Sequence, residues 1–245
     1  MINFYKRIIL KIKRKVYLIF KTKSVKGFYD IKLVPNFSDR TFNSMFMGAY
    51  GNFYSNYLSK ISASFNFVDF GSNQGLYSML SSKNEFCNKC FSFEPNPSIY
   101  QYLKRNLILN NITNVKTFNK GIGKENEKLL MYQIDNHSGS SSFIKHSDQY
   151  NKENYTEIIN YEKLSKIIPQ NYPIHIKIDV EGYEKIVLDE IIRSDFISKV
   201  KSIFIEIDTR WTHEKTITNK LNKLGFYKLN HKKQTKSHYD LLFER

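Results

Sequence analysis

The segment from Phe65 to Leu76 constrains the fold more than any other, because an apolar run there leads directly into two closely spaced glycines. Its first six residues, Phe-Asn-Phe-Val-Asp-Phe, include the aromatic and β-branched types that favour a buried strand. Gly71 and Gly75 permit backbone conformations that are closed to residues with side chains. A helix that begins near Leu76 would point its N-terminal amides at a bound ligand. The segment therefore predicts a strand, a glycine loop and a helix that hold a nucleotide-like cofactor.

The spacing of the glycines narrows the class of ligand. A dinucleotide fingerprint reads Gly-x-Gly-x-x-Gly, whereas this loop reads Gly-x-Asn-x-Gly and follows Asp69. The pattern is typical of a loop that binds a methyl donor, and it disfavours a nicotinamide-dependent oxidoreductase. A second strand-like run, 89–93, ends at Glu94, 19 residues beyond Gly75. A carboxylate at the tip of the neighbouring strand can accept hydrogen bonds from both ribose hydroxyls.

Strands alternate with helices along most of the remaining chain, which predicts an α/β fold with a mostly parallel, doubly wound sheet. The last two strands are joined by the short basic loop Asn230 to His238, so we expect an antiparallel hairpin at one edge. A mostly parallel sheet that ends in such a hairpin resembles the seven-stranded, Rossmann-like plan of class I methyltransferases. The strands expected after the first two are 115–120, 128–134, 174–179, 202–207, 226–230 and 239–244.

We expect three parts in the chain. Residues 1–26 form a basic, amphipathic helical arm, residues 27–64 a helical and loop extension, and residues 65–245 the methyltransferase domain. Within the domain, the polar segment Asp135 to Asn160 has little apolar periodicity, which predicts a long loop. This loop is either ordinary surface or a lid over an active site, because long structureless loops in compact domains are often functional.

The arm carries much of the positive charge. Residues 1–26 contain nine lysines and arginines and no acid, which is +9 of the formal net charge of +15. Apolar residues recur there at intervals of three and four, as in an amphipathic helix. The longest uncharged run, Val16 to Phe20, is too short for a bilayer span or a signal peptide. The apolar positions are Ile2, Tyr5, Ile9, Ile12, Val16 and Ile19.

Two interpretations of this arm stay open. It lies in the interface of an anionic membrane leaflet, or it packs its apolar stripe on the catalytic domain. A positive patch also attracts nucleic acid. Lysine and aromatic residues are enriched over the whole chain, however, so we do not favour that partner. We expect a cytoplasmic protein, with peripheral contact to the inner face of the membrane under the first interpretation.

With these features and one further motif, the chain resembles the FkbM-type methyltransferases, which use S-adenosylmethionine. The motif is Lys-Ile-Asp-Val-Glu-Gly-Tyr-Glu, residues 177–184, at the end of an expected strand. Together with the glycine loop and the Glu-Pro-Asn turn at 94–96, it extends the resemblance from about residue 65 to residue 208. The resemblance implies a class I methyltransferase fold, and transfer of a methyl group to a hydroxyl oxygen of a sugar or natural product.

The same resemblance implies which residues hold S-adenosylmethionine. Glu94 would contact the ribose, and Asn119, after the third strand, would contact the adenine. Asp179 would border both the cofactor and the methyl acceptor. The residues implied for the methionine end of the cofactor are Asp69, Gly71, Asn73 and Gly75.

Methyl transfer to a hydroxyl requires a base, because a hydroxyl is a poor nucleophile until its proton is accepted. Asp179 is the first candidate, since it follows a central strand at the edge where ligands bind in open α/β sheets. Glu181 lies two residues further on. His213 follows the next strand, and its neutral imidazole can serve as a base near pH 7.

An alternative to a protein base is a divalent cation held by Asp179, Glu206 and Asp208, because hard oxygen ligands suit magnesium or calcium. We do not favour it, since acids at strand ends are commonly solvated or paired with a base.

The sequence thus predicts an S-adenosylmethionine-dependent O-methyltransferase that acts on a sugar or glycolipid acceptor in bacterial surface polysaccharide or glycolipid biosynthesis. The alternatives are an RNA or natural-product methyltransferase, and a non-catalytic protein of the same fold that binds a membrane or nucleic acid.

Overall fold

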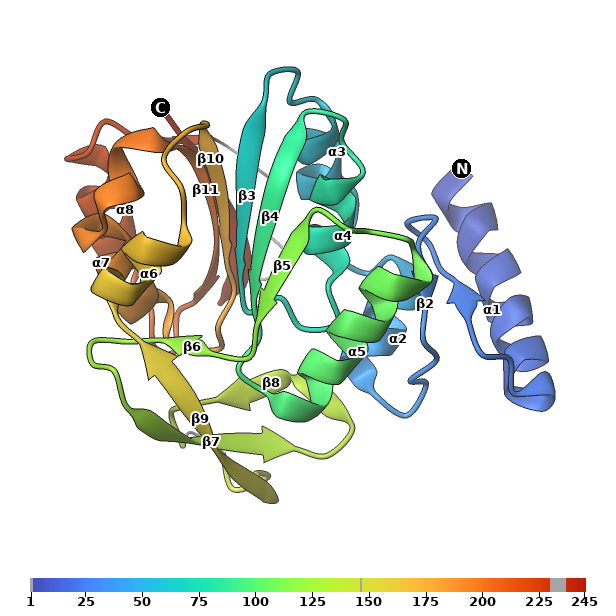
Figure 1. Cartoon of the computed structure of the whole chain (residues 1–245). Helices are drawn as coiled ribbons and strands as arrows, with labels where there is room; N and C mark the ends of the chain where they lie inside the picture. The colour runs from blue at the N-terminus through green and yellow to red at the C-terminus, as the bar shows by residue number, and fades with distance from the viewer. Residues whose placement is uncertain (1, 146, 230–236) are drawn as a thin grey trace.

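The computed structural model describes residues 2–145, 147–229 and 237–245. Its centre is a seven-stranded sheet in the order β12-β13-β11-β10-β3-β4-β5, in which all pairings are parallel except those of β13 (Figure 1). This order confirms the predicted Rossmann-like class I methyltransferase fold with its antiparallel hairpin; most of the loop 230–238 lies outside the described residues. The strands are β3 Phe65–Phe70, β4 Cys87–Phe93, β5 Val115–Phe118, β10 Ile174–Ile178, β11 Val200–Asp208, β12 Tyr227–Leu229 and β13 His238–Glu244.

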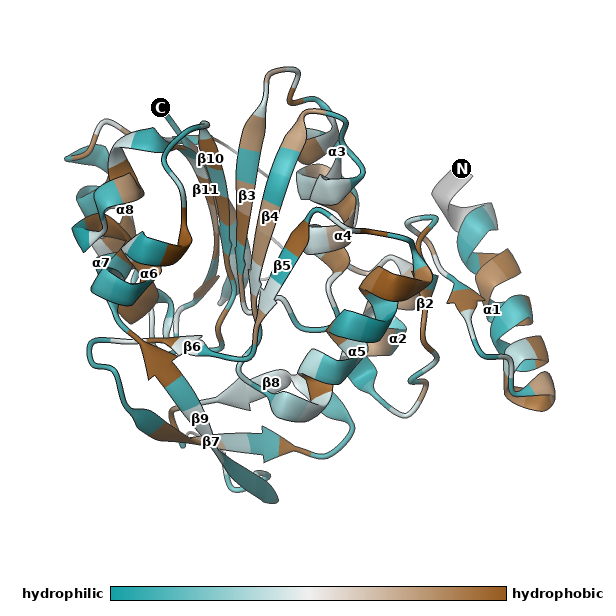
Figure 2. Ribbon diagram, viewed as in Figure 1, coloured by the Kyte–Doolittle hydropathy of each residue, from teal (hydrophilic) through white to brown (hydrophobic). Residues whose placement is uncertain are grey.

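Helices cover both faces of this sheet, with α4 and α5 on one side and α6, α7 and α8 on the other (Figure 1). Every residue of β3 and β10 is buried as a result, and Figure 2 shows apolar segments along the strands. Pro97 begins α5, where the Asn96 side chain accepts the amides of Ser98 and Ile99. The bounds are α4 Leu76–Ser82, α5 Pro97–Leu109, α6 Tyr161–Ile167, α7 Glu184–Arg193 and α8 Glu214–Asn222, with a 3-10 helix at Asp195–Lys199.

The segment before β3 packs against the sheet. Tyr54 stacks on Phe204 with ring centroids 3.9 Å apart, in an apolar cluster that includes Phe65 of β3. The helix of the predicted arm is present but ends at Phe20, and the domain boundaries at residues 26 and 64 stay predictions. No helix in the described part of the chain is both long and apolar enough to cross a bilayer. These elements are α1 Ile2–Phe20, β1 Val25–Lys26, β2 Lys32–Leu33, α2 Arg40–Met47 and α3 Phe53–Ser59.

A second, four-stranded sheet lies below the carboxyl ends of the parallel strands and corrects two predictions (Figure 1). The predicted strand 128–134 belongs to this sheet, and 135–160 is largely two strands rather than a long loop. The strand β8 is polar and has no apolar pattern that would predict it. Backbone pairing with β7 and a hydrogen bond from Ser138 N to Asp39 hold it in place. The order is β6-β9-β7-β8, with β6 Gly121–Ile122, β7 Lys128–Ile134, β8 His137–Ser142 and β9 Lys152–Ile159.

Candidate active site

A cavity of about 240 Å³ opens at the carboxyl ends of the parallel strands, where ligands bind in folds of this type. Its walls come from the glycine loop, the turn after β4, the second sheet, the motif at 177–184 and the chain in and after α2. The cavity thus joins segments that are far apart in the sequence.

The glycine loop is held by close backbone contacts. Gly71 has φ +73°, and a Cβ atom there would lie 1.8 Å from the carbonyl oxygen of Asp179, so only glycine fits. The amides of Gly71 and Ser72 both donate to Phe93 O at 3.0 Å. Ser72 Oγ and Gln74 Oε1 are buried and have no hydrogen-bond partner within the described residues. Both residues line the cavity, and unpaired polar atoms beneath its wall fit a polar ligand over the loop.

Glu94 lies at the tip of β4 and supports the same loop. Its Oε2 accepts the amide of Asn73 at 2.7 Å, and its Oε1 accepts the amide of Asn96 at 2.8 Å. Burial raises the pKa of Glu94 to about 7, although the two backbone amides oppose this rise. Each carboxylate oxygen keeps a second lone pair, so Glu94 can also accept hydrogen bonds from hydroxyl groups of a ligand in the cavity.

Lys177 is a buried cation between the glycine loop and Asp179. Its Nζ donates to Gly71 O at 2.8 Å and lies 3.1 Å from Asp179 Oδ2 and 3.6 Å from Asp69 Oδ1. Burial lowers the pKa of Lys177, but the carboxylates of Asp179 and Asp69 outweigh burial and raise it above its ordinary value. Asp69 also accepts Ser78 Oγ at 2.5 Å. Lys177 therefore fixes Asp179 relative to the glycine loop.

The rest of the motif shapes the turn after β10. Glu181 and Gly182 adopt left-handed φ values of 52° and 101°. The buried carboxylate of Glu184 accepts the amides of Val180 at 3.2 Å and Gly182 at 3.0 Å, which holds this unusual turn. Ser142 Oγ donates to Glu181 O at 2.7 Å and ties β8 to the same turn. The string Asp-Val-Glu-Gly-x-Glu thus encodes a turn in which Glu184 holds the backbone, while Asp179 and Glu181 line the cavity.

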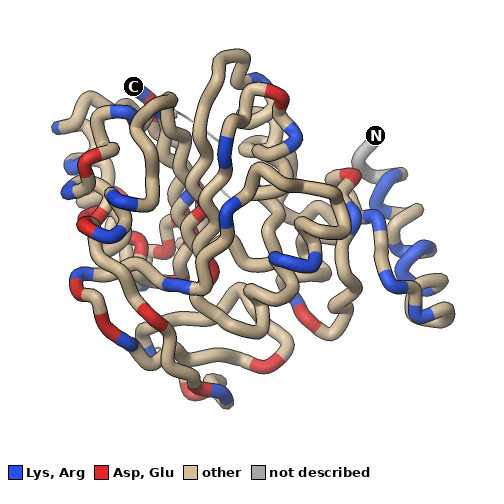
Figure 3. Tube along the Cα trace, in the orientation of Figure 1, with Lys and Arg blue, Asp and Glu red and all other residues tan. Residues whose placement is uncertain are grey.

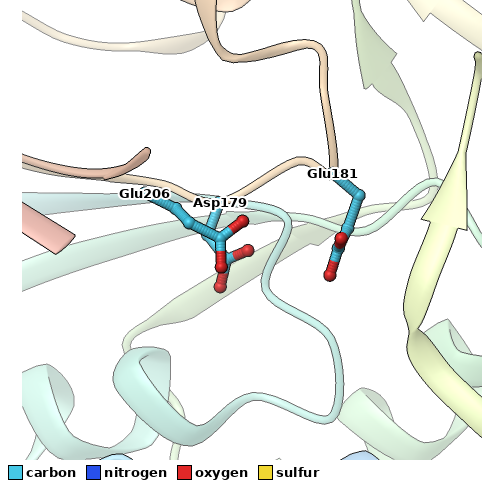
Figure 4. A group of neighbouring side chains, drawn as sticks. All are labelled: Asp179, Glu181 and Glu206. Atoms are coloured by element: carbon cyan, nitrogen blue, oxygen red, sulfur yellow. The ribbon is translucent and has the colours of Figure 1, made fainter. Parts of the chain in front are cut away.

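Three acids gather at this edge. Asp179, Glu181 and Glu206 each place an oxygen within 4.8 Å of the others, and Figure 4 shows the carboxylates of Asp179 and Glu206 close together. His238 Nε2 lies 2.7 Å from Glu206 Oε1. This hydrogen bond raises the pKa of His238 to about 9, so the imidazole is protonated at neutral pH, and burial raises the pKa of Glu206. The edge therefore combines proton acceptors with two cationic groups.

Comparison of the sequence with models of known protein families identifies the family of the chain. The model of the methyltransferase FkbM domain matches residues 69–230, well over half of the chain. The chain belongs to the FkbM methyltransferase family. The predicted resemblance to methyltransferases that use S-adenosylmethionine is thereby confirmed at the level of the family. A comparison with curated protein sequences gave no significant match.

Solved structures similar to this FkbM methyltransferase have low sequence identity to it. Trm5b from Pyrococcus abyssi has a TM-score of 0.50 at 15% identity; the match covers 91% of this chain and 56% of that one. TYW2 from M. jannaschii, in complex with AdoMet, has a TM-score of 0.48 at 13% identity and coverages of 91% and 87%. TrmK from M. capricolum, with S-adenosyl-homocysteine, gives 0.47 at 11%, with 79% and 67% covered. At these identities the likeness concerns the fold alone.

In the FkbM methyltransferase structure, the predicted catalytic histidine lies away from the cavity. His213 is exposed at the start of α8 and is not among the described residues that line the cavity, whereas His238 and His137 are. His238 is the first residue of β13 and pairs in register with Asp208, the last residue of β11. An antiparallel strand presents its amino end where parallel neighbours present their carboxyl ends. The predicted antiparallel hairpin therefore already implied that His238, at the start of its last strand, lies beside the carboxyl ends of the parallel strands.

The structure also brings together a different set of acids from the three proposed as alternative metal ligands. Asp208 is paired with Arg210, and within the described residues Glu181 takes its place beside the other two acids. Lys177 and His238 already set cationic groups against these carboxylates. A divalent cation would therefore have to compete with two side chains of the protein.

Three residues implied to contact the cofactor lie behind the cavity wall. Asn119 Nδ2 donates to the carbonyls of residues 94 and 95 at 2.8 and 3.0 Å, while Lys120 and Gly121 line the cavity. Asp69 is buried beneath the loop, and a Cβ at Gly75 would lie 2.6 Å from a side-chain atom of α5. Among the implied residues, the cavity is lined by Gly71, Asn73, Glu94 and Asp179.

A contribution from the N-terminal segment was not predicted. The carboxylate of Asp39 accepts the amides of Phe42 and Ser138, each at 2.7 Å, and Gln74 Nε2 at 3.1 Å. It therefore joins the start of α2, the second sheet and the glycine loop at one buried point. An aspartate just before a helix is a cap signal, but no local pattern gives its two distant partners.

Proposed function

We propose that this protein transfers the methyl group of S-adenosylmethionine to a hydroxyl oxygen of a saccharide, in the biosynthesis of a bacterial surface polysaccharide or glycolipid. The observation that carries the proposal is the gathering of three acidic side chains in the same cavity that the glycine loop lines. One half of the cavity suits the methyl donor, and the other suits a neutral acceptor with hydroxyl groups.

The donor half fits S-adenosylmethionine. Glu94 offers carboxylate lone pairs for ribose hydroxyls, and Ser72 Oγ and Gln74 Oε1 offer polar atoms that are otherwise unpaired. The cofactor supplies an activated methyl group on a sulfonium. Because this group is already reactive, the protein contributes mainly position and proton transfer.

The acceptor half supplies the base. Asp179 is partly exposed to the cavity, and Lys177 holds it at 3.1 Å. In the proposed reaction Asp179 accepts the proton of the acceptor hydroxyl as the oxygen attacks the methyl carbon. The protonated His238 keeps Glu206 in place, where Glu206 can orient a second hydroxyl of the acceptor. Neighbouring hydroxyl groups are the distinctive feature of a sugar.

Charge favours a saccharide over RNA as the acceptor. A phosphate group placed near Asp179 would meet a carboxylate within the cavity, whereas burial raises the pKa values of Glu181 and Glu206, so these two acids add less negative charge. A neutral sugar or natural product has no such penalty. Of these two, the paired hydrogen-bonding groups at Asp179 and Glu206 support the saccharide.

The proposal is tested by incubating glycans and glycolipids from a strain that lacks the gene with the purified enzyme and deuterated-methyl S-adenosylmethionine. Mass spectrometry of the released sugars should show one labelled methyl ether with the wild-type enzyme and none with Asp179→Asn. Asp189→Asn, on the surface of α7, is the matched control and should retain full labelling. Label found only in RNA or in a non-sugar metabolite would overturn the proposal, and so would labelling by Asp179→Asn at the wild-type rate.

A further inference from the structure

The helix α1 attaches to the rest of the protein through one narrow face. Leu10 is 3% exposed, and Tyr17 meets Phe46 edge to face with ring centroids 6.5 Å apart. Arg7 donates to Gly48 O at 2.8 Å from the same side of the helix. These contacts fix which side of α1 faces the protein.

A different face of α1 carries large apolar side chains that are exposed. Ile12 is 61% exposed and Ile19 is 73% exposed. This contradicts the interpretation in which the arm packs its apolar stripe on the catalytic domain. In α-helical geometry seven such residues fall within an arc of about 120°, centred well away from Leu10. This exposed stripe consists of Tyr5, Ile8, Ile9, Ile12, Val16, Ile19 and Phe20.

Basic residues flank the exposed stripe on both sides. In helical projection Lys13 borders one side, and Lys15 and Lys11 border the other. Figure 3 shows the lysines and arginines gathered on α1 at one edge of the molecule, and no acidic residue occurs in residues 1–26. Long lysine side chains can reach anionic headgroups while the apolar residues between them enter the acyl region.

We propose that α1 docks the protein on an anionic lipid bilayer, with the helix in the plane of the interface and the exposed stripe among the acyl chains. The charge complements phospholipid headgroups, and the stripe supplies the apolar area that holds such a helix. A second copy of the chain fits less well, because two basic helices would face each other. Nucleic acid would pair with the lysines and leave the exposed stripe in water.

Vesicle flotation with the full-length protein tests this proposal. The protein should float with vesicles that contain phosphatidylglycerol and phosphatidylcholine, and less with phosphatidylcholine alone. Ile12→Asp should weaken partitioning at least about tenfold, because burial of one isoleucine side chain is worth that much. Leu18→Asp is the matched control: it is 52% exposed on the same helix, lies outside the exposed stripe and adds the same charge. It should retain most of the binding.

Each other outcome counts against the proposal. Equal losses in Ile12→Asp and Leu18→Asp would mean adsorption by charge alone, and absence of wild-type flotation would remove the bilayer as the partner. A dimer of the wild-type protein that Ile12→Asp dissociates, measured by light scattering, would assign the exposed stripe to a second copy. Both substituted residues are exposed, so thermal melts should match that of the wild type. Flotation needs no methyl transfer, so its failure leaves the proposed enzyme activity untouched.

Discussion

The two halves of the cavity are built in different ways. The donor half, at β3 and β4, is made by backbone: the glycine loop donates to Phe93 O, and Glu94 accepts two amides. The acceptor half, at β10, β11 and β13, is made by charged side chains, with Lys177 and His238 set against the acids. Under the proposed function, binding of the donor would depend on backbone shape, whereas chemistry at the acceptor would depend on the charge of a few side chains.

The broadest effect is expected when the backbone of the donor half is changed, because both folding and cofactor binding depend on it. Gly71→Ala would place a methyl group on the carbonyl of Asp179, so we expect a loss of about 3 kcal/mol of folding free energy and of S-adenosylhomocysteine binding. Gly51→Ala is the matched control, because Gly51 has φ +70° but open space around its Cβ position. Gly51→Ala should lower the folding free energy by only about 1 kcal/mol. Similar thermal shifts in the two variants would contradict this account of the loop.

Removal of one charge from the acceptor half should separate turnover from binding. We expect Asp179→Asn to lower kcat by about 10²- to 10⁴-fold, because the amide cannot accept the hydroxyl proton. Calorimetry should find the affinity for S-adenosylhomocysteine within a factor of about three of the wild type. Equal losses in turnover and affinity would mean that Asp179 binds the cofactor, and the proposed difference between the two halves would be wrong.

The pH dependence of cofactor binding should report on the donor half. The pKa of Glu94 is raised to about 7, and ribose hydroxyls donate best to the charged carboxylate, so S-adenosylhomocysteine affinity should rise as pH increases through 7. The slope should approach about tenfold per pH unit below the pKa and vanish above it. Glu94→Gln should remove this slope and cost about 1.5 to 3 kcal/mol of binding at high pH. An unchanged slope in Glu94→Gln would assign the titration to another group.

The smallest effect is expected from metal removal. Lys177 and His238 already place positive charge against the acids, so EDTA should leave the rate of methyl transfer unchanged. A loss that magnesium restores would instead assign the three acids of the acceptor half to a metal. The rate before and after dialysis against EDTA decides this.

Local patterns explain which parts of the structure could be predicted. The strand and glycine loop at 65–76 and the acid Glu94 occupy short stretches whose residue types dictate their conformation. The role of His238 depends on which strand it neighbours, and β8 is held by backbone pairing rather than by apolar side chains. Exposure of the stripe on α1 depends on which face meets α2, and helical periodicity alone does not determine that face.

The contact between Asp39 and Ser138 joins residues 99 positions apart and forms part of the cavity wall. On a ribosome, Asp39 emerges long before Ser138, so this wall cannot close until β8 has been synthesised. The glycine loop can form earlier, since its strand and helix are adjacent in the chain. His238 comes last of all. A nascent chain would therefore acquire its donor half first, and it would become able to methylate only after the segment that carries His238 has been synthesised.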